Sequence, residues 1–180
     1  MSQLNSKFDL ISEESFASPM SMAITLAVSP TYAATYSSTP AVNTTFPAGT
    51  VVEMDSTGKA VLGTDNAQFS QAGSGTYGVT PIAPKLYAVV IDGSDTFTGS
   101  FTNKLTCLLG GFQMITTEFT GTGFTVGAPL AVGLNGSIEG SADGKIRAWN
   151  AAQKDQVFGF VGPKGHNTAD GTLHVIVPQK

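Results

Sequence analysis

The side chains that most often carry chemistry are few in this chain, and none of them completes a recognised constellation. The two histidines, His166 and His174, lack a cysteine or a further histidine at a spacing that binds zinc. Asp92 and Asp95 flank Gly93-Ser94 as in the start of a calcium-binding loop, but the later ligands and the terminal bidentate glutamate are missing. We therefore expect no metal ion and no cofactor, and an ordinary turn at the two aspartates.

Motifs for covalent catalysis and for phosphate binding are incomplete. Cys107 lies in an apolar run, residues 104–109, which predicts a small buried hydrophobic side chain rather than a nucleophile. Residues 162–165 read Gly-Pro-Lys-Gly without the frame of a phosphate-binding loop, and residues 73–75 read Gly-Ser-Gly without that of a nucleophile elbow. His174 follows the alternation of an apolar strand, where we expect it to be exposed. These patterns indicate a protein that is not an enzyme.

The composition favours β-structure and argues against nucleic-acid and membrane binding. The 180 residues include 21 glycines and only 12% charged side chains, which favours strands joined by tight turns. The net charge is −4 and the nine basic residues are scattered, so we expect neither a nucleic-acid surface nor a basic membrane-binding helix. No apolar run is long enough to span a membrane, and a single cysteine without a disulfide fits a reducing cytosol.

The chain is organised around a stretch that occurs twice, at residues 46–58 and 124–136. Both copies read Phe-x-x-Gly-x-x-aliphatic-x-apolar-x-x-x-Gly, and their glycines are nine residues apart (58 − 49 and 136 − 127). Apolar residues two apart lie on one face of a strand, so each copy predicts a strand with an inward-facing apolar pair. These inward pairs are Val52 with Met54 and Leu130 with Val132. We expect the glycines to form structural turns at Gly49, Gly58, Gly127 and Gly136.

Two further pieces follow each copy in the same order. Residues 77–79 (Tyr-Gly-Val) resemble residues 158–161 (Phe-Gly-Phe-Val), and the apolar run 86–91 resembles the run 173–177. We interpret the series as an internal duplication of one β-rich unit, although any all-β chain contains similar Gly-x-x-Val patterns. The predicted fold class is therefore all-β, with two related small β-barrel or sandwich-like units. Only short helices are expected, the best candidate being residues 150–156.

The predicted organisation has an extended N-terminal arm, residues 1–45, followed by one β-rich domain, residues 46–180. Within the domain, the two similar units span residues 46–91 and 124–178. Residues 92–123 join them and carry strand candidates at 104–109 and 112–119, on either side of Gly110-Gly111. This arrangement predicts a β-hairpin between the units.

The N-terminal arm differs from the rest of the chain because no charged residue occurs from Ser15 through Val52. It lacks the apolar periodicity of an element that forms its own core, so its backbone polar groups need partners elsewhere. Its lack of charge suits burial along a neighbour, and its spaced apolar residues suit strand addition or pocket filling. We therefore predict that the arm is the main partner-binding segment, through Phe8, Leu10, Ile11, Phe16, Met20, Met22, Ile24, Leu26 and Val28.

The repeated unit resembles the head decoration, or capsid cement, proteins of tailed bacteriophages. The resemblance rests on Phe46-x-x-Gly49-x-x-Val52, on the Gly58 turn, and on an aromatic-Gly step before a final strand, seen again at 158–161. It implies a structural protein of the virion that is made in the host cytoplasm and sits on the outer capsid surface, often as a trimer. Such proteins clamp neighbouring subunits of the major capsid protein with extended terminal arms. The doubled unit departs from the single-unit members of this family.

A second function class remains open beside the first. A β-rich tail, adhesin or pilus-type module that recognises a surface glycan or protein would also be low in charge and without catalytic residues. Saturable binding to mature shells, but not to their precursors, distinguishes a decoration protein from such a module.

Overall fold

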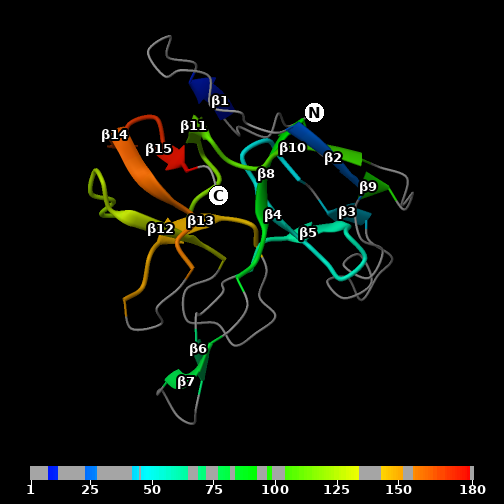
Figure 1. Ribbon diagram of the computed structural model, residues 1–180. Helices are drawn as coiled ribbons and strands as arrows, with labels where there is room; N and C mark the ends of the chain where they lie inside the picture. The colour runs from blue at the N-terminus through cyan, green and yellow to red at the C-terminus, as the bar shows by residue number, and fades with distance from the viewer. Residues whose placement is uncertain are drawn as a thin grey trace.

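The computed structural model describes residues 8–11, 23–27, 42–44, 46–64, 69–71, 77–81, 84–92, 97–98, 104–133, 143–151 and 156–178. Within these ranges the regular structure consists of β-strands, and no helix occurs. The predicted all-β fold class is therefore confirmed. The helix candidate at 150–156 lies partly outside the described residues, and the described ones, 150, 151 and 156, are not helical. Two large antiparallel sheets form the body of the protein (Figure 1).

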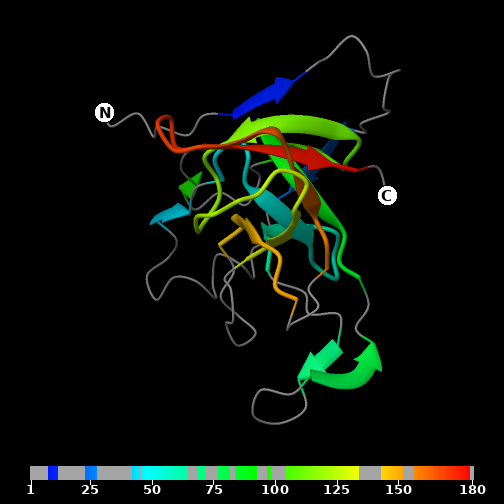
Figure 2. The same cartoon turned by 90° about the vertical axis from the view of Figure 1, so that its left-hand side faces the viewer.

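Each large sheet combines strands that are distant in the sequence. The six-stranded sheet has the order β1 (Phe8–Ile11), β11 (Phe112–Thr116), β15 (Thr172–Val177), β14 (Gly159–Asn167), β12 (Pro129–Val132), β13 (Ile146–Ala148). The five-stranded sheet has the order β2 (Ala23–Ala27), β10 (Lys104–Leu108), β8 (Tyr87–Asp92), β4 (Val51–Met54), β5 (Ala60–Leu62). Two small ribbons accompany them, β3 (Val42–Thr44) with β9 (Phe97–Thr98) and β6 (Phe69–Gln71) with β7 (Tyr77–Pro81). The β6–β7 ribbon stands apart from both large sheets (Figures 1 and 2).

The two large sheets repeat one topology. In chain order, the five strands β2, β4, β5, β8 and β10 correspond to β11, β12, β13, β14 and β15. The order within each sheet then matches strand for strand, since β2-β10-β8-β4-β5 corresponds to β11-β15-β14-β12-β13. All of these pairings are antiparallel. The fold is therefore an internal duplication of a five-stranded unit, and β1 is an additional strand at the edge of the second unit.

The repeated sequence motif forms the same turn in both units. Gly49 and Gly127 have positive φ values of 94° and 80°, which a glycine adopts without steric strain. Each turn is closed by a hydrogen bond across four residues, Thr50 N to Pro47 O at 3.1 Å and Ala128 N to Thr125 O at 2.9 Å. Gly58 also has a positive φ, 76°. The turn predictions for these three glycines are confirmed, and Gly136 lies outside the described residues.

After the turn, each motif holds one valine of a neighbouring strand between two backbone hydrogen bonds. Gly49 N donates to Val90 O at 2.7 Å, and Gly127 N donates to Val161 O at 2.9 Å. The valine amides complete the pattern, because Val90 N donates to Thr50 O and Val161 N to Ala128 O, both at 2.9 Å. Val90 of β8 is thus equivalent to Val161 of β14.

This equivalence corrects the downstream part of the predicted repeat. The sequence comparison matched 86–91 with 173–177 and 77–79 with 158–161, whereas the hydrogen-bond patterns show that β8 is the equivalent of β14. β7, which contains residues 77–79, lies in a separate ribbon with β6. The comparison failed because short apolar strands are chemically alike, so their sequences do not identify their neighbours in a sheet.

The predicted unit boundaries and the predicted hairpin are also wrong. β10 pairs with β2 and β8, whereas β11 pairs with β1 and β15, so the two strands around Gly110-Gly111 lie in different sheets. Both glycines have positive φ values, 116° and 73°. Such a backbone turns the chain out of one sheet and into the other, which consecutive glycines allow. The first unit therefore reaches back to β2 in the predicted arm and forward to β10.

Each unit has its own apolar core. In the five-stranded sheet, one face buries residues that include Phe46 and Val52, and Met54 packs against them. The full buried set is Leu26, Phe46, Val52, Ala60, Ala88, Val90, Leu105 and Cys107. The six-stranded sheet buries Leu130 and Val132 in a second cluster, against which Phe124 packs. The inward direction predicted for the repeated apolar pairs is therefore confirmed.

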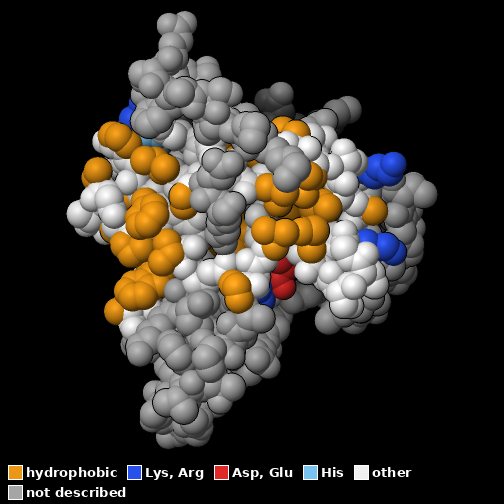
Figure 3. Space-filling view, viewed as in Figure 1, with side chains coloured by type: hydrophobic (Ala, Val, Ile, Leu, Met, Phe, Trp, Pro, Cys, Tyr) orange, Lys and Arg blue, Asp and Glu red, His pale blue; other side chains and the backbone are white. Residues whose placement is uncertain are grey.

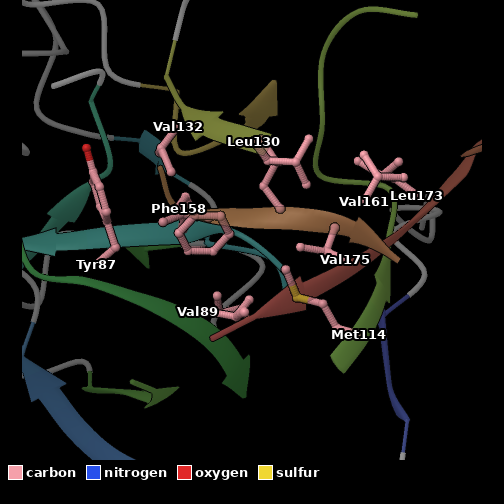
Figure 4. Close-up of a cluster of buried hydrophobic side chains, with 12 residues drawn as sticks. Tyr87, Val89, Met114, Leu130, Val132, Phe158, Val161, Leu173 and Val175 are labelled. Carbon is pink, nitrogen blue, oxygen red and sulfur yellow. The ribbon is translucent and has the colours of Figure 1, made fainter. Parts of the chain in front are cut away.

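The second core also joins the two units. Val51, Tyr87 and Val89 come from the five-stranded sheet but belong to the cluster formed by the six-stranded sheet. Figure 4 shows Tyr87 and Val89 beside the residues of that cluster. The remaining buried members are Met114, Leu130, Val132, Ile146, Phe158, Val161, Leu173, Val175 and Val177. The rings of Tyr87 and Phe158 meet edge to face with their centroids 6.1 Å apart. The five-stranded sheet is thus buried on both faces.

Backbone hydrogen bonds join the two sheets at a corner made by Gly144. Val51 N donates to Gly144 O at 2.8 Å, and Gly144 N donates to Gly63 O at 3.1 Å. A Cβ atom at Gly144 would lie 2.7 Å from both Val51 O and Thr50 Cγ2. Gly144 also has a φ of 65°. Only glycine fits this corner without displacing the backbone of β4.

We expect Gly144→Ala to lower the free energy of unfolding by about 2–5 kcal/mol, because left-handed strain of about 1–2 kcal/mol adds to overpacking of about 1–3 kcal/mol. Gly58→Ala is the matched control: its φ is 76°, but nothing lies within 4 Å of the added Cβ. Gly58→Ala should therefore lose only the stability that corresponds to the left-handed strain, about 1–2 kcal/mol. Chemical denaturation of both variants measures the difference, and equal losses would refute the steric role of the corner.

Candidate partner-binding surface

The structure places five of the predicted arm residues in strands of the chain itself. Phe8, Leu10 and Ile11 belong to β1, which pairs with β11 from Phe8 opposite Thr116 to Ile11 opposite Gln113. Ile24 and Leu26 belong to β2, which pairs with β10. Phe16, Met20, Met22 and Val28 lie outside the described residues. The N-terminal region therefore contributes one strand to each large sheet.

Leu26, which was predicted to bind a partner, takes part in the chain's own core. Its side chain is 7% exposed and belongs to the core of the five-stranded sheet, and Ile24 packs against the same core. The physical reason is the pairing register, which sets Leu26 opposite Leu105 and Ile24 opposite Cys107. Because alternate side chains of a strand point the same way, both aliphatic groups face the core.

β1 and β2 are the terminal strands of their sheets, and no other strand in the described part of the chain pairs with their second edges. An edge strand carries a row of backbone N–H and C=O groups that can pair with a further strand. In β2, Ala23 and Thr25 are exposed while Leu26 is buried. Within the described residues, the prediction of strand addition therefore applies to the outer edges of β1 and β2.

A second exposed region is formed by the loop before β12 and the β14–β15 hairpin. The rings of Phe119, Phe124 and His166 meet edge to face, with centroid separations of 5.5, 5.1 and 5.5 Å. Val126 stands at the tip of the loop and is 57% exposed. The sequence analysis missed this cluster because His166 follows Phe119 by 47 residues (166 − 119) and no sequence motif connects the two. The aromatic contacts hold the two loops against each other.

Single apolar side chains are also exposed near the six-stranded sheet, and Figure 3 shows hydrophobic groups gathered on that side of the molecule. Phe160, 38% exposed, pairs across the strands with Pro129 and Ile176, which are both half-buried. Together they form a short apolar row on the outer face of the sheet. Isolated exposed hydrophobic residues are common on soluble proteins, so this row alone identifies no partner.

His174 is buried, which contradicts the prediction of an exposed strand residue. It is 3% exposed, because residues 162–165 pass over its ring where the register of β14 shifts. Lys164 N donates to Nδ1 of His174 at 3.0 Å, and Nε2 lies 3.0 Å from Oε1 of Gln113. A Cβ atom at Gly162 would lie 2.6 Å from the same ring. His174 is therefore a hydrogen-bonded structural residue that fixes the Gly-Pro-Lys-Gly segment.

The edge of β13 is covered by the segment that follows β11. Phe119 forms a parallel bridge with Ile146, in which Ile146 N donates to Glu118 O at 3.0 Å and Thr120 N donates to Ile146 O at 2.8 Å. This single bridge is not a continuous ladder, and no closed barrel is seen in the described part of the chain.

Two partly buried carboxyl groups lie beside this bridge. Burial raises the pKa of Glu118 above its ordinary value of 4.5, and the charge of Lys145 and a hydrogen bond from Thr117 oppose the rise. Burial likewise raises the pKa of Asp143 above 3.8, opposed by a hydrogen bond from Lys145 N. Ionising either carboxyl group in the folded protein therefore costs free energy.

The described residues contain no group of three or more His, Cys, Asp and Glu side chains placed to hold a metal ion. They also contain no helix long and apolar enough to cross a membrane. Asp92 ends β8, and the rest of the predicted turn, 93–95, lies outside the described residues.

Comparison with other proteins gives no relative: the chain matches no protein-family model, no curated protein and no solved structure.

Cys107 should be unreactive in the folded protein. Its side chain is completely buried, and burial raises the pKa of the thiol to about 12, so the reactive thiolate is scarce at neutral pH. A thiol reagent such as DTNB at pH 8 should label it only after denaturation. Stoichiometric labelling of the native protein within the mixing time would show that β10 and β2 do not enclose this residue.

Glu118→Gln should stabilise the protein at neutral pH and have little effect near pH 4. A carboxyl whose pKa is raised by folding contributes its stability below the unfolded pKa, and that contribution is lost as the pH rises through the folded pKa. The amide of glutamine does not ionise, so the variant keeps this contribution to stability at neutral pH. Thermal unfolding of both proteins from pH 4 to pH 7.5 measures the effect. A difference in Tm that does not change with pH would exclude a titrating Glu118.

Proposed function

We propose that the protein is a structural component of a phage virion that binds the outer surface of the mature capsid and stabilises it by clamping neighbouring capsid subunits. The observation that carries the proposal is the duplicated five-stranded unit, whose N-terminal strands β1 and β2 leave an outer edge on each large sheet. Two such edges in one chain give two contact surfaces. A shell built of repeated subunits offers repeated sites at which both can act.

The proposed mode of contact is strand addition. A partner segment that pairs with an outer edge gains backbone hydrogen bonds, and alternate side chains give the pairing its register. Each such contact is weak, because ordering one residue costs about 1–2 kcal/mol in backbone entropy. Two contacts per chain, repeated over a shell, compensate through effective concentration. Low charge suits this role, since a buried unpaired charge is costly.

The alternative is a β-rich tail, adhesin or pilus-type module that recognises a surface glycan or protein. The observation that favours it is the exposed Val126 in the loop that also carries Phe119 and Phe124, whose rings contact His166. Here the contact would lie at the loops rather than at the strand edges. The two functions therefore predict different binding residues.

The test uses shells assembled from the major capsid protein encoded in the same genome, in precursor and in expanded form. The full chain should co-sediment saturably with expanded shells and not with precursors. A variant that starts at Ser12 lacks β1 and should bind far more weakly, provided that circular dichroism shows it folded. The matched variant Val126→Ser changes only the exposed loop tip and should bind normally.

Absence of saturable binding to expanded shells would refute the decoration function. Loss of binding in Val126→Ser with normal binding by the chain that starts at Ser12 would move the contact to the loops and support the alternative.

A further inference from the structure

The internal duplication shows where a strand position is filled in one unit and open in the other. In the second unit, β1 pairs with the outer edge of β11. The strand of the first unit that is equivalent to β11 is β2. Within the described residues no strand pairs with the outer edge of β2. The fold therefore presents an acceptor edge at β2 that corresponds to the edge covered by β1.

The sequence of β2 is nearly symmetrical about its central residue. It reads Ala23-Ile24-Thr25-Leu26-Ala27, with alanine at both ends and a large aliphatic residue on each side of Thr25. If two copies pair antiparallel about Thr25, Ala23 lies opposite Ala27 and Ile24 lies opposite Leu26 of the second copy. Side chains on the core face then stay on the core face in both copies, because the period of a strand is two.

The edge also lacks the features that usually prevent edge-to-edge association. Natural edge strands carry charges, a proline or a bulge. β2 contains no charged residue and no proline, and its pairing with β10 runs without a register shift. Ala23 and Thr25 are exposed, and a Thr–Thr pair across two strands is a favourable contact. β1, by contrast, carries Asp9.

We propose that β2 is a self-association surface at which two copies of this chain pair antiparallel across a two-fold axis, joining their five-stranded sheets into one continuous sheet. The occupant is a second copy because the strand is complementary to itself and carries no charge that would recognise a partner of opposite sign. This inference does not depend on capsid binding. In the dimer the two β2 edges pair with each other, so the contact proposed for the capsid then falls to the β1 edge of each copy. It differs from the trimer implied by the family resemblance, and the two states have different masses.

The direct test is a single cysteine at the two-fold axis. In a Cys107→Ala background, Thr25→Cys places each new thiol opposite its own mate, where directly opposed residues of antiparallel strands have Cα atoms about 4.5–5.5 Å apart. That separation suits a disulfide. Ala23→Cys is the matched control. It is equally exposed, but its own mate is four residues further along the strands, roughly 14 Å away.

Light scattering of the full chain should give a mass twice that of one chain. Mild oxidation of the Thr25→Cys protein should give a covalent dimer, and the Ala23→Cys protein should remain monomeric in denaturing gels. Thr25→Lys places two ammonium groups opposite each other and should give a single-chain mass with unchanged circular dichroism. A full-chain mass of one or three chains, equal cross-linking at both cysteines, or a Thr25→Lys protein that remains dimeric would each overturn the proposal.

Discussion

The burial of the five-stranded sheet on both of its faces is the constraint on which the rest of the structure depends. Val52 and Val90 fill the core of their own unit, while Val51 and Val89 fill the core of the other. A buried aliphatic side chain contributes about 1.5–3 kcal/mol, so separating the units would expose a large part of the apolar surface that stabilises the fold. The duplicated units therefore form one body. Glycine at positions 63 and 144 is required because the sheets meet there through backbone hydrogen bonds.

The local parts of this fold could be predicted from the sequence, because local chemistry determines them. The spacing of Gly49 and Gly127 relative to Val52 and Leu130 predicts a turn followed by an inward-facing strand, and both occur. The strand pairings could not be predicted in the same way. β8 pairs with β4 and β14 with β12 through contacts distant in the sequence, and a short apolar strand such as residues 86–91 fits several positions.

The candidate site shows the same division between local and distant effects. The apolar residues of the N-terminal region were expected to bind a partner, and the described ones lie in strands of the chain's own sheets. The identity of their acceptor was not predictable, because β10 and β11 become available edges only after Gly110-Gly111 has separated them into different sheets. His174 was misplaced for a related reason: its burial depends on a register shift in β14 that no periodicity reveals. The aromatic loop cluster likewise exists only in the folded chain.

The central claim is that this duplicated β-protein lies on the outside of a capsid. Cryo-electron microscopy of the native particle tests it most directly, since the density shows both the position of the chain and the strands that touch the shell. The account predicts density on the outer capsid surface that fits two sheets of the topology described here, with β1 against the capsid protein. Density for this chain at the tail, or an outer capsid surface without it, would contradict the account.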